Sequence, residues 1–279
     1  MTGPEIQINA TSDGRASWRE FPFWLVLIIA WLIIMAILII TMPNYNEAYQ
    51  FIRGELSIFN ESGQLEIVAT GLFMTIQVTI IGFLIALVLG LMAGLGRISN
   101  NTAIRTTAVT YIEFVRGVPT LVLIFTLAFV IVPPISDALG LENRMGQHWR
   151  AIIALAVIYG AFLAEIFRAG IESIPPGQME AARSLGMTYG QAMRNIILPQ
   201  AIRNISPALG NDFIAMLKDS SLVSVLAVRD LTQMGRLYAG RTFRFRESYL
   251  VLTFFYLTMT IILSLLLRWY ERRLGKEGQ

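Results

Sequence analysis

Long stretches without a charged residue constrain this chain more than any other feature of its sequence. Residues 24–42 form a run of 19 residues, and residues 67–95 a run of 29, with no Asp, Glu, Lys or Arg. A helix of about 20 apolar residues crosses the hydrocarbon core of a bilayer. Over all 279 residues, 55% are hydrophobic and 15% are charged, whereas soluble proteins carry about 25% charged residues. We therefore expect an all-α integral membrane protein.

Four further apolar runs bring the expected number of transmembrane helices to about six. These runs cover residues 108–132, 151–174, 205–228 and 249–267. The first helix, expected at residues 23–42, starts too late and is too long for a cleaved signal peptide, so it should be retained. It separates a polar segment, residues 1–22, from an acidic loop, residues 43–65.

The distribution of basic residues predicts the orientation of the chain. Cytoplasmic loops of membrane proteins carry an excess of Lys and Arg, and an even number of spans places both termini on one side. Cytoplasmic termini put most of the basic residues inside: Arg15, Arg19, Arg97, Arg105, Arg183, Arg194, Arg203 and the tail after Arg268. The acidic loop 43–65 is then external. The five arginines of residues 229–247 would also be external, against the rule, and this conflict makes the bounds of the fifth helix uncertain.

The residues that enzymes and metal sites require are missing. The chain contains no cysteine and a single histidine, His148, which cannot build a zinc site alone. The glycines at Gly94 and Gly96 do not extend into a phosphate-binding fingerprint. We therefore expect that this chain is not an enzyme and has no catalytic residues. We also expect no metal, no cofactor and no nucleic-acid partner for it.

Small residues recur every four positions in the second apolar run. They are Gly82, Ala86, Gly90 and Gly94. Such a stripe lets two helix backbones approach closely. Packing within one subunit and contact between two subunits both explain the stripe.

Charged residues near the ends of the apolar runs have an interfacial explanation. Glu113 and Arg116 fall in the first turns of the third run, and Glu165 and Arg168 lie three residues apart near the end of the fourth. Residues at this spacing share a helix face. An ion pair that steadies the helix at the membrane surface is the simpler interpretation of Glu165 and Arg168.

Between the fourth and fifth runs lies a polar stretch, residues 175–199, that is built to form two short helices. Two prolines and Gly177 end the preceding helix. A first short helix should end at Gly186, where a left-handed cap costs least. Thr188 can cap a second one, and Pro199 marks its far boundary. An ordered loop of this length is more often functional than a plain connector.

The spacing within this stretch resembles a known family. Glu180-Ala181-Ala182, Gly186, Ile196 and Leu198-Pro199 match the EAA loop of permease subunits of ATP-binding cassette (ABC) importers. The resemblance implies that residues 178–195, with Arg183 among them, form coupling helices that sit in a cleft of the ATPase subunit. It places the EAA coupling loop at residues 175–206.

Two more stretches narrow the resemblance to polar amino acid permeases of the histidine and glutamine type. Residues 111–119 read YIEFVRGVP, similar to the Y-x-E-x-x-R-G-x-P pattern of that group. Residues 209–222 contain LGNDF and LKDSSL, which look like its second signature. The resemblance covers residues 66–274, a permease domain of five core helices, and leaves a short cytoplasmic tail, residues 275–279. The first helix is an addition whose role the family does not supply.

The second signature is polar within an apolar run. Pro207 and Gly210 should loosen the helix there. Backbone groups freed in this way are tolerated within a membrane only where they meet protein or water. The residues expected to line a substrate pathway are Asn211, Asp212, Lys218, Asp219 and Ser220. A structural Lys218–Asp219 pair is an equal alternative.

The resemblance also implies a set of partners. They are an ATPase subunit that binds ATP and Mg, an external solute-binding protein, a second permease subunit (the same or different), the lipid bilayer and a polar amino acid. The expected location is the bacterial inner membrane, with a multi-pass topology. A self-contained secondary transporter or channel, or an ABC permease for another small polar solute, are the alternatives.

Overall fold

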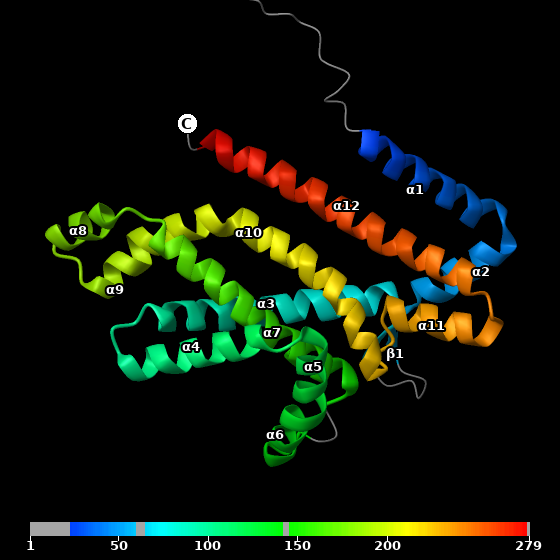
Figure 1. Ribbon diagram of the computed structural model, residues 1–279, viewed down its shortest axis with the longest axis horizontal. Helices are drawn as coiled ribbons and strands as arrows, with labels where there is room; N and C mark the ends of the chain where they lie inside the picture. Colours follow the sequence, from blue (N-terminus) through cyan, green and yellow to red (C-terminus); the bar gives the residue numbers. More distant parts are fainter. Residues whose placement is uncertain (1–22, 60–64, 142–144, 278–279) are drawn as a thin grey trace, which may run out of the picture.

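The computed structural model describes residues 23–59, 65–141 and 145–277. The predicted N-terminal segment 1–22 lies outside these residues. The described part is built from helices and one small hairpin (Figure 1). The first part of the described chain forms α1 (Phe23–Thr41), α2 (Pro43–Arg53), β1 (Leu56–Phe59), β2 (Leu65–Ala69), α3 (Leu72–Arg97) and α4 (Thr102–Gly117). The middle of the chain forms α5 (Thr120–Phe125), the π-helical turn η2 (Thr126–Ile131), α6 (Val132–Ala138) and α7 (Gln147–Glu172). The remainder forms α8 (Pro176–Ser184), α9 (Tyr189–Ala192), the π-helical turn η3 (Met193–Ile197), α10 (Leu198–Asp219), the 3-10 helix η4 (Ser220–Leu226), α11 (Leu231–Thr242) and α12 (Phe245–Glu277).

The helical membrane architecture predicted from the sequence is confirmed. Four helical stretches of the described chain are long and apolar enough to cross a membrane: α3, α5 to α6, α7 and the greater part of α12. The bent pair α1 and α2 makes a fifth. Adding α10, which carries too many polar residues to qualify by composition, gives six segments in the expected order.

The bounds of the third and fifth segments differ from the prediction. Residues 108–132 were expected to form one helix, but α4 ends at Gly117 and a new helix begins after Pro119, because proline disfavours helical backbone in the residue before it. In the fifth run, α10 gives way to η4 at Ser220. The predicted tail 275–279 is helical as far as Glu277.

Helix α7 is the centre of the bundle. Many of its apolar side chains, among them Leu155, Ile158 and Leu163, are fully buried, and they pack with residues of α3, α5 and α10 in one core. Figure 1 shows α8 and α9 projecting at one end of this bundle and α2 and α11 lying at the other. We call these ends the α8 end and the α11 end.

The additional first helix packs against the last one. Met35 and Ile39 of α1 are buried in a separate cluster with residues of α2, α11 and α12, while other α1 side chains such as Leu27 and Ile40 are exposed. A helix that is apolar all round and mostly exposed is suited to lipid contact. After α1 the chain bends by 101° into α2.

The predicted external loop is largely ordered. Helix α2 buries Tyr45, Ala48 and Ile52 on one face, at the spacing of an amphipathic helix. Strands β1 and β2 pair antiparallel with Leu56 opposite Ala69, which adds a short pair of strands to the otherwise helical part of the chain that the structure describes.

The arginine-rich segment and the acidic segment meet at the α11 end. Arg244 forms an ion pair with Glu47 of α2 at 2.7 Å, and the Arg241 guanidinium lies 5.4 Å from the centre of the Phe51 ring. Residues 229–247 form α11 and its flanks rather than a loop. Two of the five arginines of this segment therefore contact the segment that follows α1.

Candidate functional site

The EAA loop folds into the two short helices that its sequence predicts. Helix α8 ends before Gly186, whose φ is +84°, a left-handed conformation that glycine adopts without steric cost. Thr188 accepts a hydrogen bond from the Gln191 amide and forms a full capping box with that residue. The cap fixes the angle at which α9 leaves the loop. The predictions for Gly186 and Thr188 are confirmed.

The boundary predicted at Pro199 is wrong. The chain stays helical from α9 through η3 into α10, and Pro199 occupies the first turn of α10. Pro199 has no amide to donate, and it lies directly after the π-helical turn η3, where the hydrogen-bonding pattern of the helix changes. The EAA loop therefore has no flexible joint before α10.

The loop is also fixed to α7. Only residues 173–175 separate α7 from α8. The Ser173 hydroxyl donates to the Gly170 carbonyl at 2.7 Å, and the Asn204 amide donates to that hydroxyl at 3.3 Å. Ile171 of α7, Ile197 of η3 and Ala201 of α10 form a small core beneath the loop with Ile174 of the linker. A displacement of α8 must therefore be shared by α7 and α10.

The predicted coupling residues divide between an inner and an outer face. Ala182 is buried, whereas Glu180, Ala181, Arg183 and Gly186 are exposed. Ile196 and Leu198 are half-buried and Pro199 is exposed. The outer face therefore offers one acidic side chain, one basic side chain and small residues.

Two exposed apolar residues of the loop were not predicted as functional. The Leu185 side chain is 81% exposed and that of Tyr189 is 50% exposed. Both flank Gly186 on the outer part of the loop. Large apolar side chains at the exposed tip of a polar loop are typical of a surface that binds another protein. In the sequence, the only feature that could have indicated these two residues was their nearness to Gly186.

Helix α10 is continuous where the sequence suggested a break. Pro207 cannot donate to the Arg203 carbonyl, and the Ser206 hydroxyl donates to that carbonyl instead at 2.9 Å. A Cβ on Gly210 would lie 2.3 Å from Leu267 Cδ1 of α12, so the glycine allows α10 and α12 to approach closely. The helix continues through Pro207 and Gly210. The expectation that they loosen the helix is therefore wrong.

One acidic residue of the predicted pathway is bound by a tyrosine of α7. The Tyr159 hydroxyl donates to Asp219 Oδ2 at 2.9 Å. Asp212 and Asp219 are seven residues apart and so share one face of α10. The sequence analysis missed Tyr159, whose aromatic side chain in an apolar run carries no distinctive spacing.

The other pathway residues are arranged differently. Asn211 and Lys218 are exposed, on a face of α10 adjacent to that of the two aspartates. Ser220 is buried and donates to the Leu217 carbonyl at 2.7 Å. Among the described residues, Lys218 is not within ion-pair distance of Asp219, so the alternative of a structural pair is not what the structure contains.

The stripe of small residues is used within the chain. Gly82, Ala86, Gly90 and Gly94 are all buried. A Cβ on Gly90 would lie 2.7 Å from the Leu163 Cβ, and one on Gly94 would lie 2.8 Å from the Ala164 carbonyl oxygen. The stripe therefore brings α3 against α7, which leaves this face unavailable to a second subunit.

A buried carboxyl at the α11 end has an unusual environment. Asp230 caps α11 by accepting from the Gln233 amide at 2.9 Å, while its Oδ2 has no hydrogen-bond partner. Burial raises the pKa of the Asp230 carboxyl to about 7. The Leu231 amide beside it donates to the Thr75 hydroxyl at 3.0 Å. This aspartate joins α11 to the start of α3.

Within the described residues, no group of three or more His, Asp or Glu side chains is arranged to hold a metal ion.

Comparison with known proteins identifies the family. The family described as "Binding-protein-dependent transport system inner membrane component" matches residues 86–276. The chain is 39% identical over 203 residues to a probable amino-acid permease protein, YxeN, of Bacillus subtilis (strain 168), covering 73% of this chain and 89% of that protein. It is 34% identical over 204 residues to the glutamine transport system permease protein GlnP of Escherichia coli (strain K12), covering 73% and 91% of the two chains.

Solved structures lead to the same group. The crystal structure of an amino acid ABC transporter with histidines superposes with a TM-score of 0.63 at 41% identity, covering 73% of this chain and 92% of that one. A bacterial alginate ABC transporter superposes over 92% of this chain with a TM-score of 0.56 at 16% identity, a likeness of fold alone. The chain belongs to the binding-protein-dependent transport system inner membrane component family, within which it is a permease of the polar amino acid ABC importer type.

Proposed function

We propose that this chain carries a polar amino acid across the bacterial inner membrane and is driven through its EAA loop by a separate ATPase subunit. The observation that carries the proposal is the form of that loop. It is an exposed pair of helices at one end of the bundle, connected without a flexible joint to α7 and α10. A partner that moves α8 would therefore move two helices that border the pathway.

The outer face of the loop suits a protein groove. Small residues at Ala181 and Gly186 permit close backbone approach, Glu180 and Arg183 offer directional polar contacts, and Leu185 supplies an exposed apolar side chain. Polar contacts around a small apolar centre are the usual composition of a protein–protein interface. ATP and Mg would bind to the ATPase partner. Differential binding of ATP to two states of the complex would supply the energy for transport.

The acidic face of α10 is proposed as part of the substrate pathway. Asp219, with the Tyr159 hydroxyl beside it, and Asp212 on the same helix face offer negative charge and hydrogen-bonding groups. Ionisable groups within a membrane protein usually mark a substrate path or a paired structural site. All amino acids carry an ammonium group that carboxylates can bind.

The topology belongs to the proposal. Both termini and the EAA loop would face the cytoplasm, and the α11 end would face an external solute-binding protein. The functional complex would contain two permease subunits, the same or different, and two ATPase subunits.

Reconstitution tests this function. Proteoliposomes would contain the permease with its ATPase, and the solute-binding protein would be loaded with each amino acid of a panel. ATP-dependent uptake of one polar amino acid is the expected result, and no uptake should occur without the ATPase. Uptake by the permease alone would instead identify a self-contained transporter, and uptake only of a solute that is not an amino acid would replace the substrate class.

A further inference from the structure

An ion-pair network joins α3, α4 and α7 on the side of the bundle that leads to the EAA loop. Its members are Arg97 of α3, Glu113 and Arg116 of α4, and Glu165, Arg168 and Glu172 of α7. The network contains three positive and three negative side chains. The sequence alone suggested a local pair on one helix, whereas the structure connects three helices.

Glu165 is the only one of these carboxylates that contacts all three arginines. Its Oε1 pairs with Arg97 and lies 3.9 Å from Arg116, and its Oε2 accepts from the Arg168 guanidinium at 3.0 Å. Glu113 pairs only with Arg97, at 3.4 Å, and Glu172 only with Arg168. Loss of the Glu165 charge would leave three guanidinium groups around one neutral side chain.

Burial makes this carboxylate matter more than a surface ion pair. The Glu165 side chain is 18% exposed and that of Arg97 is 25% exposed. A partly buried charge that loses its partner is strongly unfavourable, whereas an exposed pair contributes little. The Glu165–Arg97 contact is therefore the firm link between α7 and α3, and the longer contact with the more exposed Arg116 is the weaker link to α4.

The network lies between the EAA loop and the break at Pro119, and this position indicates its role. Helix α7 runs from Glu165 directly into α8 of the EAA loop, with three residues between the two helices. Arg116 lies one residue before the end of α4, next to the break at Pro119 where the chain turns into α5. Figure 1 shows α3 and α4 running beside α7 toward the end that carries α8 and α9.

We propose that Glu165 is a positioning residue that transmits movement of the EAA loop from α7 to the α3–α4 hairpin, so that the three helices move together during transport. This proposal rests on the proposed function of the loop. Glu165 does not need to touch the substrate or the ATPase. Its carboxylate keeps α3 and α4 aligned with the helix that the loop moves.

The chain offers a matched control. Glu172→Gln removes a carboxylate from the same helix and from the same Arg168, but it breaks no contact between helices. Glu165→Asp keeps the charge. In the reconstituted importer, Glu165→Gln should lower the amount of amino acid transported per ATP hydrolysed by about tenfold. Glu165→Asp should restore most of the loss, Glu172→Gln should match the unchanged protein, and all variants should still bind the ATPase.

A second measurement does not depend on transport. The natural sequence has no cysteine, so spin labels can be placed on cysteines at the exposed positions Phe114 of α4 and Ala169 of α7. The distance distribution between the labels in the purified permease should broaden in Glu165→Gln and stay narrow in Glu172→Gln.

The outcomes separate the two proposals. If the unchanged importer shows no ATP-driven uptake, the proposed function fails, and the label distances alone decide whether Glu165 aligns the helices. If Glu165→Gln and Glu172→Gln give the same transport ratio and the same distances, the role of Glu165 is refuted.

Discussion

The Tyr159 hydroxyl of α7 donates a hydrogen bond of 2.9 Å to the Asp219 carboxylate at the end of α10. This bond connects the two helices between which the EAA loop is inserted. It lies at the point where α10 changes to the 3-10 helix η4. A substrate that binds the carboxylate must compete with the tyrosine or be held together with it.

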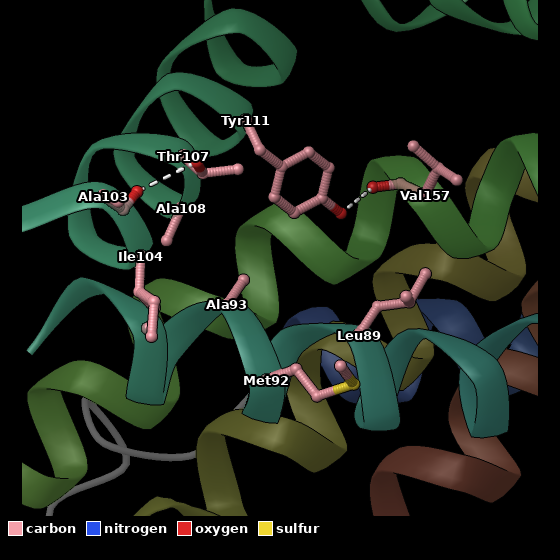
Figure 2. A pocket seen from close by; sticks show the side chains of 10 residues that line it. Leu89, Met92, Ala93, Ala103, Ile104, Thr107, Ala108, Tyr111 and Val157 are labelled. Atoms are coloured by element: carbon pink, nitrogen blue, oxygen red, sulfur yellow. Dashed lines mark hydrogen bonds between the residues drawn. The ribbon is translucent and has the colours of Figure 1, made fainter. Parts of the chain in front are cut away.

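Removal of this hydroxyl should weaken transport without unfolding the protein. In Tyr159→Phe, the Asp219 carboxylate loses a donor, and we expect a reduced initial rate of uptake with normal membrane insertion. Asp219→Asn should have the larger effect, because it also removes the charge. Uptake of radiolabelled amino acid measures both. Tyr111→Phe is the control, since that hydroxyl donates to the backbone carbonyl of Val157 (Figure 2). Equal losses in the two Phe variants would argue against a role in the pathway.

Substitutions on the outer face of the EAA loop should separate the ATPase from the permease. Glu180→Lys reverses an exposed charge, and we expect the ATPase to be lost during co-purification while the permease stays inserted. Gly186→Val should act through the backbone, because a side chain has open space there but a left-handed residue other than glycine costs about 1–2 kcal/mol.

The control for the glycine is Gly190→Ala. Gly190 also has open space around it and does not have a positive φ. Co-purification of the ATPase with this variant should be unchanged. Full ATPase binding by Glu180→Lys and Gly186→Val would show that the loop is not the docking surface.

The contact between α3 and α7 should tolerate no enlargement. In Gly94→Leu, the new side chain would collide with the Ala164 carbonyl and the Phe167 Cβ, and overpacking of this kind costs about 1–3 kcal/mol. We expect a lower Tm in detergent. Val88→Leu on the exposed face of the same helix should leave the Tm unchanged, and an equal Tm in Gly94→Leu would mean that the two helices are not closely packed.

The Asp230 carboxyl should make stability depend on pH. Its pKa is raised by burial from 3.8 to about 7. The neutral form is therefore the one that the folded protein favours. The stability that it contributes is complete below about pH 4 and is lost as the pH rises through about 7, by a few kcal/mol at most.

Asp230→Asn keeps the cap of α11 and removes the titration. Asparagine is as good an N-cap as aspartate, and its side-chain amide has nearly the same shape and does not titrate. Tm values between pH 5 and pH 8 should fall in the unchanged protein and stay level in Asp230→Asn. Parallel curves for the two proteins would contradict the assigned pKa.

Most of the architecture could be predicted from the sequence, because lipid imposes long apolar helices and these are visible as uncharged runs. The two short helices of the EAA loop were also predictable, since Gly186 acts through its own backbone conformation and the Thr188 side chain caps a helix three residues away. The joint after Gly117 was hidden because apolar residues continue on both sides of it. The continuity of α10 was hidden because the Ser206 hydroxyl replaces the missing amide of Pro207.

The contacts between distant segments could not be predicted. Nothing in the spacing of Arg97, Arg116 and Glu165 indicates that three helices bring them together. Tyr159 meets Asp219 only because α7 and α10 pack side by side. The rule that places basic residues in cytoplasmic loops conflicts with an external position of residues 229–247. That rule counts residues along the sequence, so it takes no account of contacts such as the ion pair between Arg244 and Glu47.

The 101° bend between α1 and α2 has a consequence for how the protein sits in its membrane. In the proposed topology, α1 would cross the bilayer and α2, turned away from its axis, would mark the level of the lipid headgroups. Stacking of Tyr49 on Phe255 at 4.9 Å ties that level to α12. The added N-terminal helix would thus hold the permease at a fixed depth, so that rotation of the bundle during transport need not change how far the α11 end stands above the lipid.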